Sequence, residues 1–319
     1  MSKISVVVPI YNSEKYIERC VVSLFDQTLD DIEYIFIDDC STDNSIQILN
    51  NVIKRYPHRS SNVIIHSMHV NRGVAKARIW GIKHASGDYI IHCDADDWVD
   101  NGLYELLYNK AIEDNADIAV CDYIIWKSSD NKQIVSCCKS SDAKNFFESI
   151  INQKESWSLW NKLIHRNICK NSSIINPTGI MGEDAVLVLQ YAYLSRKISH
   201  CKGGYYYYFF NSESITKSSS EEKVYHKFKH SIMNAEQLIK FFNTNNLDNK
   251  YRKQIDKILF NKKNLLIPNL GKIYYYKIWK NTFSLINFRI IFNSEVPITE
   301  RLRHILLLLG LRLNVNRIK

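Results

Sequence analysis

Apolar β-branched runs alternate with segments of helical periodicity over the first 126 residues. Five of these runs predict strands, at 4–8, 34–37, 63–66, 89–93 and 118–126, and the first two are continuous enough to predict buried strands. Between them, apolar residues recur three or four positions apart and predict helices, at 16–25, 74–85 and 102–113. This alternation predicts an α/β protein with a mainly parallel, Rossmann-like sheet flanked by helices. The polar stretch 128–141 is expected to be a loop.

Polar clusters directly follow the first, second and fourth predicted strands. In parallel sheets, ligands bind beyond the carboxyl ends of the strands. After the fourth strand come Asp94, Ala95 and Asp96, and on an extended segment the two carboxylates point the same way. Together they suit a hard cation such as Mg²⁺ or Mn²⁺. A solvated loop or a helix start is the structural alternative, and turn chemistry likewise explains the pair Asp38 and Asp39.

Five segments, in the right order and at the right spacing, resemble the family 2 glycosyltransferases with the GT-A fold. They are ISVVVPIYN (4–12), SLFDQT (23–28), IDDCSTD (37–43), NRGVAKAR (71–78) and GDYIIHCDADD (87–97). A weaker resemblance extends to about residue 215, through 160–163, 182–184 and the tyrosines at 205–208. The resemblance implies transfer of a hexosyl-type sugar from a nucleotide-diphosphate sugar, and the family favours a UDP-sugar as donor. The acceptor would be a hydroxyl of a bacterial surface-glycan precursor.

The resemblance also implies roles for individual residues. Asp39 would contact the base, Arg78 would lie near the diphosphate, and Asp96 would be the principal ligand of Mn²⁺ or Mg²⁺, with Asp94 beside it. The implied donor-nucleotide set is Pro9, Ile10, Tyr11, Asp39, Arg78, Asp94 and Ala95.

The Gly-Glu-Asp segment matches the family's catalytic-base motif. We therefore expect Asp184 to take the acceptor proton in an inverting transfer, with Glu183 as the second candidate. Without the resemblance, a helix N-terminus would explain both acids. Trp160 and Lys162 are candidate acceptor contacts, because an aromatic face suits a sugar ring and an ammonium suits a phosphate. Core packing is the alternative for the aromatic residues.

Two positions depart from the family pattern. Cys40 replaces the usual glycine of the Asp-Asp-Gly-Ser turn, so a positive φ is less expected there. Ile79 stands where a polar residue usually follows the arginine. That change alters either donor choice or only the packing of the helix.

The basic charge is concentrated at the C-terminal end. The chain has a net charge of +9, and residues 221–319 hold 19 Lys and Arg against 7 Asp and Glu. We expect two domains: 1–215, which is catalytic, and 216–319, which is basic and mainly helical. The second domain would contact the acceptor, an anionic membrane surface or a second copy of the chain. A plain solvated surface is the alternative.

Several function classes are disfavoured by what the chain lacks. It has no CxxC pair and no signal peptide, so we expect reduced thiols in a cytoplasmic protein. It has no apolar run of about 20 residues, so we expect the protein either free in the cytoplasm or peripheral on the inner face of the membrane. A polyprenyl-phosphate glycosyltransferase usually carries membrane helices. A non-catalytic nucleotide-sugar-binding paralogue would be expected to lose its carboxylates. No nucleic-acid motif is present, so nucleic acid is not expected as a partner.

Overall fold

The computed structural model describes residues 2–137, 140–210 and 220–311. The chain divides into two compact units. Unit 1 comprises Met1–Asn176 and Leu187–Asn211, and unit 2 comprises Pro177–Val186 and Ser212–Lys319. The domain boundary expected at 215/216 lies outside the described residues. Residues 177–186, which the sequence analysis placed in the first domain, belong to unit 2.

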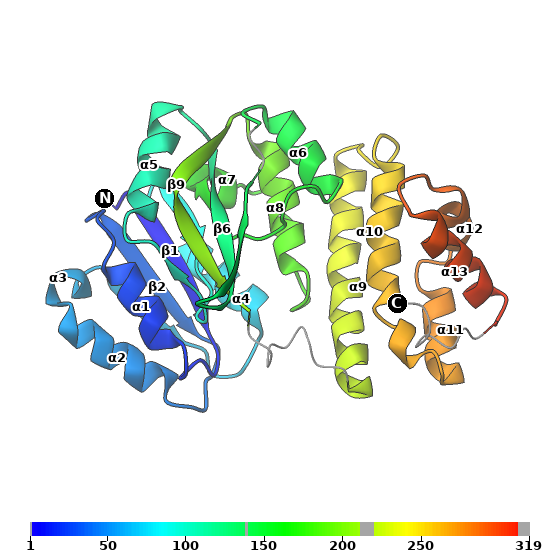
Figure 1. Cartoon of the computed structure of the whole chain (residues 1–319), viewed down its shortest axis with the longest axis horizontal. Helices are drawn as coiled ribbons and strands as arrows, with labels where there is room; N and C mark the ends of the chain where they lie inside the picture. Colours follow the sequence, from blue (N-terminus) through cyan, green and yellow to red (C-terminus); the bar gives the residue numbers. More distant parts are fainter. Residues whose placement is uncertain (1, 138–139, 211–219, 312–319) are drawn as a thin grey trace. The chain divides into compact units, whose positions relative to one another are not determined.

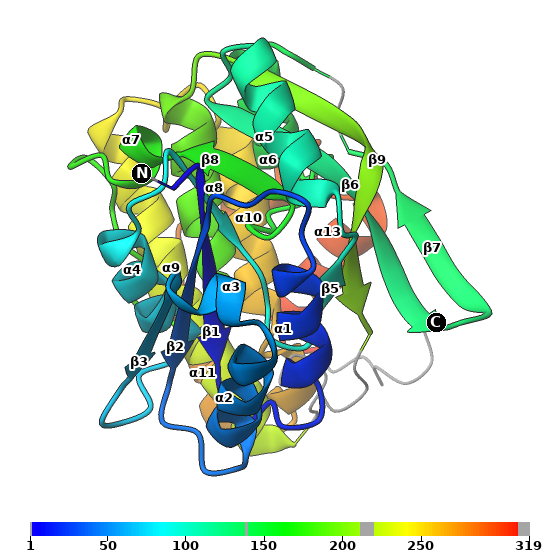
Figure 2. The ribbon, with the colours of Figure 1, turned by 90° about the vertical axis from the view of Figure 1, so that its left-hand side faces the viewer.

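The first half of unit 1 is a parallel sheet with the strand order β3-β2-β1-β4. Figure 2 shows β3, β2 and β1 side by side. The strands are β1 (Ile4–Ile10), β2 (Ile32–Asp38), β3 (Val63–Ser67) and β4 (Tyr89–His92). The connecting helices are α1 (Ile17–Phe25), α2 (Ser45–Arg55), α3 (Pro57–Ser60) and α4 (Val74–His84). The predicted apolar stripe of α1 is its buried face.

The second half of unit 1 extends this sheet through β4 with strands of mixed direction. Among the described residues, the full order is β3-β2-β1-β4-β8-β6-β9-β5, with β7 paired to β6. The added strands are β5 (Trp98–Val99), β6 (Ile118–Ser128), β7 (Asn131–Val135), β8 (Lys162–His165) and β9 (Ile198–Phe209). The helices are α5 (Leu103–Glu113), α6 (Ala143–Ile151), α7 (Arg166–Cys169) and α8 (Glu183–Leu194), which belongs to unit 1 from Leu187 onward. The α/β class is confirmed, but the sheet is mixed, because β8 runs antiparallel to both β4 and β6.

The expected loop 128–141 was partly wrong, because it contains β7. This strand forms a hairpin with β6, and its residues 131–134 are exposed. A strand with two wet faces lacks the apolar alternation by which strands are recognised in a sequence.

Unit 2 is helical in its described part, as expected for the C-terminal region. Its elements are α9 (Glu221–Thr244), α10 (Arg252–Asn264), η2 (Ile267–Asn269), α11 (Ile273–Asn281), α12 (Ile286–Arg289), η3 (Ile290–Phe292) and α13 (Ile298–Leu308). Helices α9 and α10 lie side by side (Figure 1). Trp279 and Phe228 belong to the core cluster of this unit. No helix of the described chain has both the length and the apolar character needed to cross a bilayer.

Candidate active site

The acidic segment that follows β4 is a tight turn. The backbone N–H of Asp97 donates to the carbonyl of Asp94 over 3.0 Å, so the extended geometry expected for 94–96 was wrong. Tyr206 in β9 holds both ends of this turn. Its hydroxyl accepts from the Asp94 N–H (3.1 Å) and donates to Asp97 Oδ2 (2.6 Å). The N–H of Phe209 donates to Asp97 Oδ1 (2.7 Å), so β9 fixes the turn by three hydrogen bonds.

Negative charge accumulates in this turn. Burial, reinforced by the charge of Asp94, raises the pKa of Asp96 to about 6. Burial, together with the charges of Asp96 and Asp94, raises the pKa of Asp97 well above its usual range. Arg78 offsets part of this charge, since its Nη2 lies 2.7 Å from Asp94 Oδ1. Ionised together, the carboxylates of the turn repel one another, and a cation would relieve that repulsion.

Asp94 and Asp96 fit a hard cation by their chemistry, because carboxylate oxygens are its preferred ligands. In the described residues, however, no group of three or more acidic, His or Cys side chains is arranged to hold a metal ion. A cation at this turn would therefore need further ligands, such as the phosphate oxygens of a bound nucleotide.

Asp39 lies at the end of β2 and anchors the loop that leads into α4. Its Oδ1 accepts from the Arg72 N–H and its Oδ2 from the Gly73 N–H, both at 2.7 Å. Burial raises the pKa of Asp39, and these two backbone donors partly counter the rise. Each carboxylate oxygen retains a second acceptor site, so contact with a base N–H stays compatible with this geometry.

The end of β1 lies against the same polar edge of the sheet. Pro9 and Ile10 are the last residues of β1, and the Ile10 carbonyl accepts from the Asp39 N–H over 2.8 Å. Tyr11 comes next and is 44% exposed. Ala95 is buried in the acidic turn. The structure thus connects the backbone at Ile10 to Asp39, and Arg78 to Asp94.

The two departures from the family pattern have different outcomes. Cys40 has φ = +65°, so the expectation that its side chain would disfavour the left-handed turn was wrong. A non-glycine residue in that conformation costs about 1–2 kcal/mol. Next to Ile79, Trp80 stacks between His66 and His84, with ring centroids 3.9 and 3.7 Å away. This arrangement packs α4 against β3.

The two acceptor candidates are both buried. Trp160 is 7% exposed and stacks on Tyr206 (ring centroids 4.3 Å apart, 14° between planes) and on Tyr208 (5.8 Å). It therefore supports the tyrosine that holds the acidic turn.

Lys162 is fully buried, which does not fit the phosphate contact expected from the sequence. Its ammonium donates to the carbonyls of Ser156 (3.0 Å) and Ser158 (2.8 Å) and to Asn161 Oδ1 (2.8 Å). These bonds give Lys162 a structural role inside unit 1.

The expected base motif belongs to unit 2, where Asn234 of α9 holds the loop before it. Asn234 Oδ1 accepts from the N–H groups of Thr178 and Gly179, both at 2.9 Å. Its Nδ2 donates to the carbonyls of Gly179 (2.8 Å) and Met181 (3.0 Å). One buried amide therefore satisfies four backbone groups just before α8.

Glu183 and Asp184 form the acidic first turn of α8, and Lys262 of α10 lies beside them. Burial lowers the pKa of Lys262, and the charges of Glu183 and Asp184 act in the opposite direction. At Gly182, φ is +75°, and an added Cβ would lie 2.5 Å from Lys262 Nζ. The positive φ favours glycine here, and any larger residue would also have to displace the end of the flexible lysine side chain.

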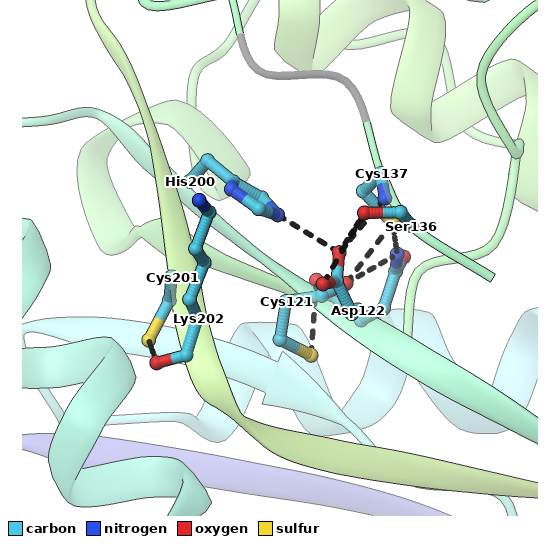
Figure 3. Close-up of polar contacts among 8 residues, drawn as sticks. Cys121, Asp122, Ser136, Cys137, His200, Cys201 and Lys202 are labelled. Atoms are coloured by element: carbon cyan, nitrogen blue, oxygen red, sulfur yellow. Dashed lines mark hydrogen bonds and ion pairs between the residues drawn. The ribbon is translucent and has the colours of Figure 1, made fainter. Parts of the chain in front are cut away.

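A second polar cluster lies around Asp122 on β6 (Figure 3). Its carboxylate bonds the His200 ring (2.8 Å), the Cys137 N–H (2.8 Å) and, weakly, the Ser136 hydroxyl (3.4 Å). These contacts join β6, β9 and the end of β7, which gives His200 a structural role. The cysteines in the described part of the chain are free thiols.

Sequence reasoning missed Tyr206, Asn234 and Lys262 as partners of the acidic motifs. Tyr206 lies 109 positions after Asp97 and was noted only as part of an aromatic run. Asn234 and Lys262 lie in helices with many other polar residues, and no motif distinguishes them. An asparagine on the mainly apolar face of α9, between Phe228 and Leu238, is a weak signal of a buried polar anchor, because Ser231 lies on the same face.

A sheet with its polar loops gathered at the ends of parallel strands, and an acidic turn there, is the arrangement of nucleotide-binding α/β folds. Comparison with known proteins gives the same class. The description "Glycosyl transferase family 2" matches residues 5–177, more than half of the chain. The chain belongs to this family and is a glycosyltransferase.

Two curated relatives and one solved structure illustrate the match. The chain is 30% identical over 252 residues to the "Cholesterol galactosyltransferase" of Borreliella burgdorferi, covering 75% of this chain and 68% of that protein. It is 30% identical over 244 residues to "Glycosyltransferase GlyA" of Streptococcus pneumoniae, covering 73% of this chain but only 33% of the relative's length. The crystal structure of S. aureus TarS 1–349 with UDP-GlcNAc superposes with a TM-score of 0.59 at 20% identity, covering 82% of this chain and 81% of that one.

Proposed function

We propose that the chain is an inverting glycosyltransferase that moves a hexosyl-type sugar from a UDP-sugar to a hydroxyl of a surface-glycan precursor. The observation that carries the proposal is the acidic turn 94–97, which β9 fixes and whose Asp94 is paired with Arg78. An anionic diphosphate can bind there only with additional positive charge. The family membership supports a nucleotide-sugar donor, and the UDP-GlcNAc bound by the TarS neighbour supports uridine.

The donor nucleotide would lie over the end of β1, with Pro9, Ile10 and Tyr11 beneath it and Asp39 on the base. Asp96 and Asp94 would hold Mn²⁺ or Mg²⁺. When bound, that ion would supply positive charge to the departing diphosphate. Arg78 lies beside Asp94 and would hold that carboxylate in place.

Asp184 is proposed as the general base, with Glu183 as the alternative. It would accept the proton of the acceptor hydroxyl while the hydroxyl oxygen attacks the anomeric carbon from the face opposite the nucleotide. The bond to the diphosphate breaks with its electron pair on the leaving group. Lys262 beside the motif favours the ionised, proton-accepting form of these carboxylates.

The acceptor is proposed to be lipid-linked and presented at the inner face of the membrane, where the enzyme would work as a peripheral cytoplasmic protein. Two observations support this. Residues 221–319 are strongly basic, and the Borreliella relative is described as acting on cholesterol, a lipid.

The test is a thermal-shift series with UDP, GDP and their sugars, with and without Mn²⁺. Ligand at a hundredfold excess over Kd stabilises the native state by about 2.7 kcal/mol. We expect a metal-dependent shift with UDP that disappears in Asp96→Asn and persists in Asp130→Asn, which changes an exposed aspartate of the β6–β7 turn. A metal-dependent thermal shift in Asp96→Asn equal to that of the wild type would contradict the role of Asp96 as a metal ligand.

A further inference from the structure

Unit 2 carries apolar side chains that are largely exposed to solvent. Leu285 is 78% exposed, and Phe288 and Phe292 are 69% and 68% exposed. On α13 and just after it, Ile298, Leu302 and Leu309 are also exposed. These six residues are called the apolar C-terminal face below.

Helical spacing explains why these side chains point outward. Residues 285, 288 and 292 lie three and four positions apart, on one side of the α12–η3 segment, while Ile286 and Ile290 on its other side are completely buried. The rings of Phe288 and Phe292 lie 5.3 Å apart.

Helix α13 repeats this arrangement. His304 and Leu307 are buried, and Ile298, Leu302 and Leu309 fall on the opposite side at a 100° turn per residue. Helix α13 packs directly against η3, and the Arg301 guanidinium donates to the Ile291 carbonyl. The two exposed stripes therefore belong to neighbouring elements (Figure 1).

Positive charge accompanies this face. Between 272 and 303 the chain has six Lys and Arg, of which Lys272, Arg289 and Arg303 form ion pairs with Glu221, Asp256 and Glu300. Lys272, Lys277 and Lys280 of the α11 segment are exposed. Apolar side chains combined with an excess of cations are the features by which helices lie in the interface of an anionic bilayer.

We propose that the apolar C-terminal face binds the surface of an anionic lipid bilayer, with the phenylalanines and leucines at the boundary between headgroups and acyl chains. Helix α13 has 11 residues, which corresponds to roughly 16 Å and is too short for a hydrocarbon core of about 30 Å. It would therefore lie in the interface. The inference deepens the proposed function, on which it rests for a membrane-bound acceptor.

The test is flotation of the full chain with vesicles of phosphatidylcholine, with and without about 30 mol% phosphatidylglycerol as the anionic lipid. We expect the wild type to float only with the anionic vesicles and binding to fall as salt is raised. The double variant Phe288→Ser/Phe292→Ser should lose binding about tenfold or more. Ile134→Ser, at an exposed apolar residue of β7, should bind as the wild type does.

Two controls separate the other outcomes. The nucleotide thermal shift should be the same in wild type and double variant, so a failed donor site and a failed membrane face are distinguishable. Light scattering reports the oligomeric state. Equal flotation of the double variant and the wild type, or no flotation with anionic vesicles, would overturn the proposal. Loss of a dimer in the double variant with vesicle binding unchanged would instead assign the face to a second copy.

Discussion

The Tyr206 hydroxyl donates to Asp97 Oδ2 over 2.6 Å while accepting from the Asp94 N–H. Removing it by Tyr206→Phe leaves a buried carboxylate with one partner fewer, which costs about 1–3 kcal/mol. We expect a lower unfolding midpoint in urea and a KM for the donor raised roughly tenfold, consistent with about 1.4 kcal/mol of lost positioning. Tyr208→Phe, which keeps its ring stacked on Trp160, is the matched control. An unchanged donor KM in Tyr206→Phe would show that the turn holds without the hydroxyl.

Substituting the proposed base should separate donor binding from transfer. In Asp184→Asn, the thermal shift with UDP and Mn²⁺ should match that of the wild type, because the acidic turn is untouched. The transfer rate should fall about 10²–10⁴-fold, the usual contribution of a positioned base. Glu183→Gln is the paired variant. If Glu183→Gln loses transfer and Asp184→Asn retains it, the two roles are exchanged.

Lys262 should set the pH at which the base motif is ionised. Its positive charge favours the carboxylates of Glu183 and Asp184, so its removal in Lys262→Met should raise the pKa of the base. The acidic limb of the kcat/KM profile is then expected at higher pH, with the alkaline limb unchanged. A uniform loss of rate at every pH would instead indicate that Lys262 is only structural.

Lys263 should make unit 2 more stable as the pH rises above neutrality. Burial lowers the pKa of Lys263 from 10.5 to about 7. Between these values the unfolded chain holds the proton and the folded chain does not, so stability rises by up to about 1.4 kcal/mol per pH unit. Urea unfolding at pH 7.5 and 9.5 measures this gain.

Lys263→Met should reduce that slope, to which the lowered pKa of Lys262 also contributes, and should raise stability at pH 7.5 by about 1–4 kcal/mol, because an apolar side chain avoids the cost of burying an amine. Lys253→Met, at an exposed position of α10, should retain the wild-type slope. If the free energy of unfolding of Lys263→Met depends on pH as strongly as that of the wild type, Lys263 is not the source of the pH dependence.

The parallel half of the sheet could be predicted because each of its strands carries its own continuous apolar run. The mixed half could not. Strand β8 has only four residues. In β9, polar residues and two glycines precede the tyrosines and obscure the apolar pattern of a strand. Pairing of β9 with β6 depends on contacts about 80 residues apart, such as Ala119 with Ser199, and local periodicity carries no information about such pairs.

The candidate active site could likewise be predicted only in part from the sequence. Asp39, Asp94 and Asp96 could be named because a motif carries them, whereas the turn that presents Asp94 and Asp96 depends on Tyr206. Lys162 was misjudged because a lysine in a sequence indicates charge and exposure, and only the fold shows the carbonyls that surround its ammonium. The left-handed Cys40 shows that surrounding structure can impose a conformation that the residue itself disfavours.

The segment 177–186, which is the loop before α8 together with the first turn of that helix, has a consequence for how members of this family diversify. It belongs to unit 2 and is tied to α9 by Asn234, yet α8 continues from it into unit 1. A recombination that replaced everything after residue 210 would combine the native loop with a foreign α9. The backbone groups of the loop would then lack the hydrogen bonds that Asn234 provides. Exchange of acceptor preference between relatives should therefore succeed only when the segment 177–186 and the region after residue 210 are replaced together.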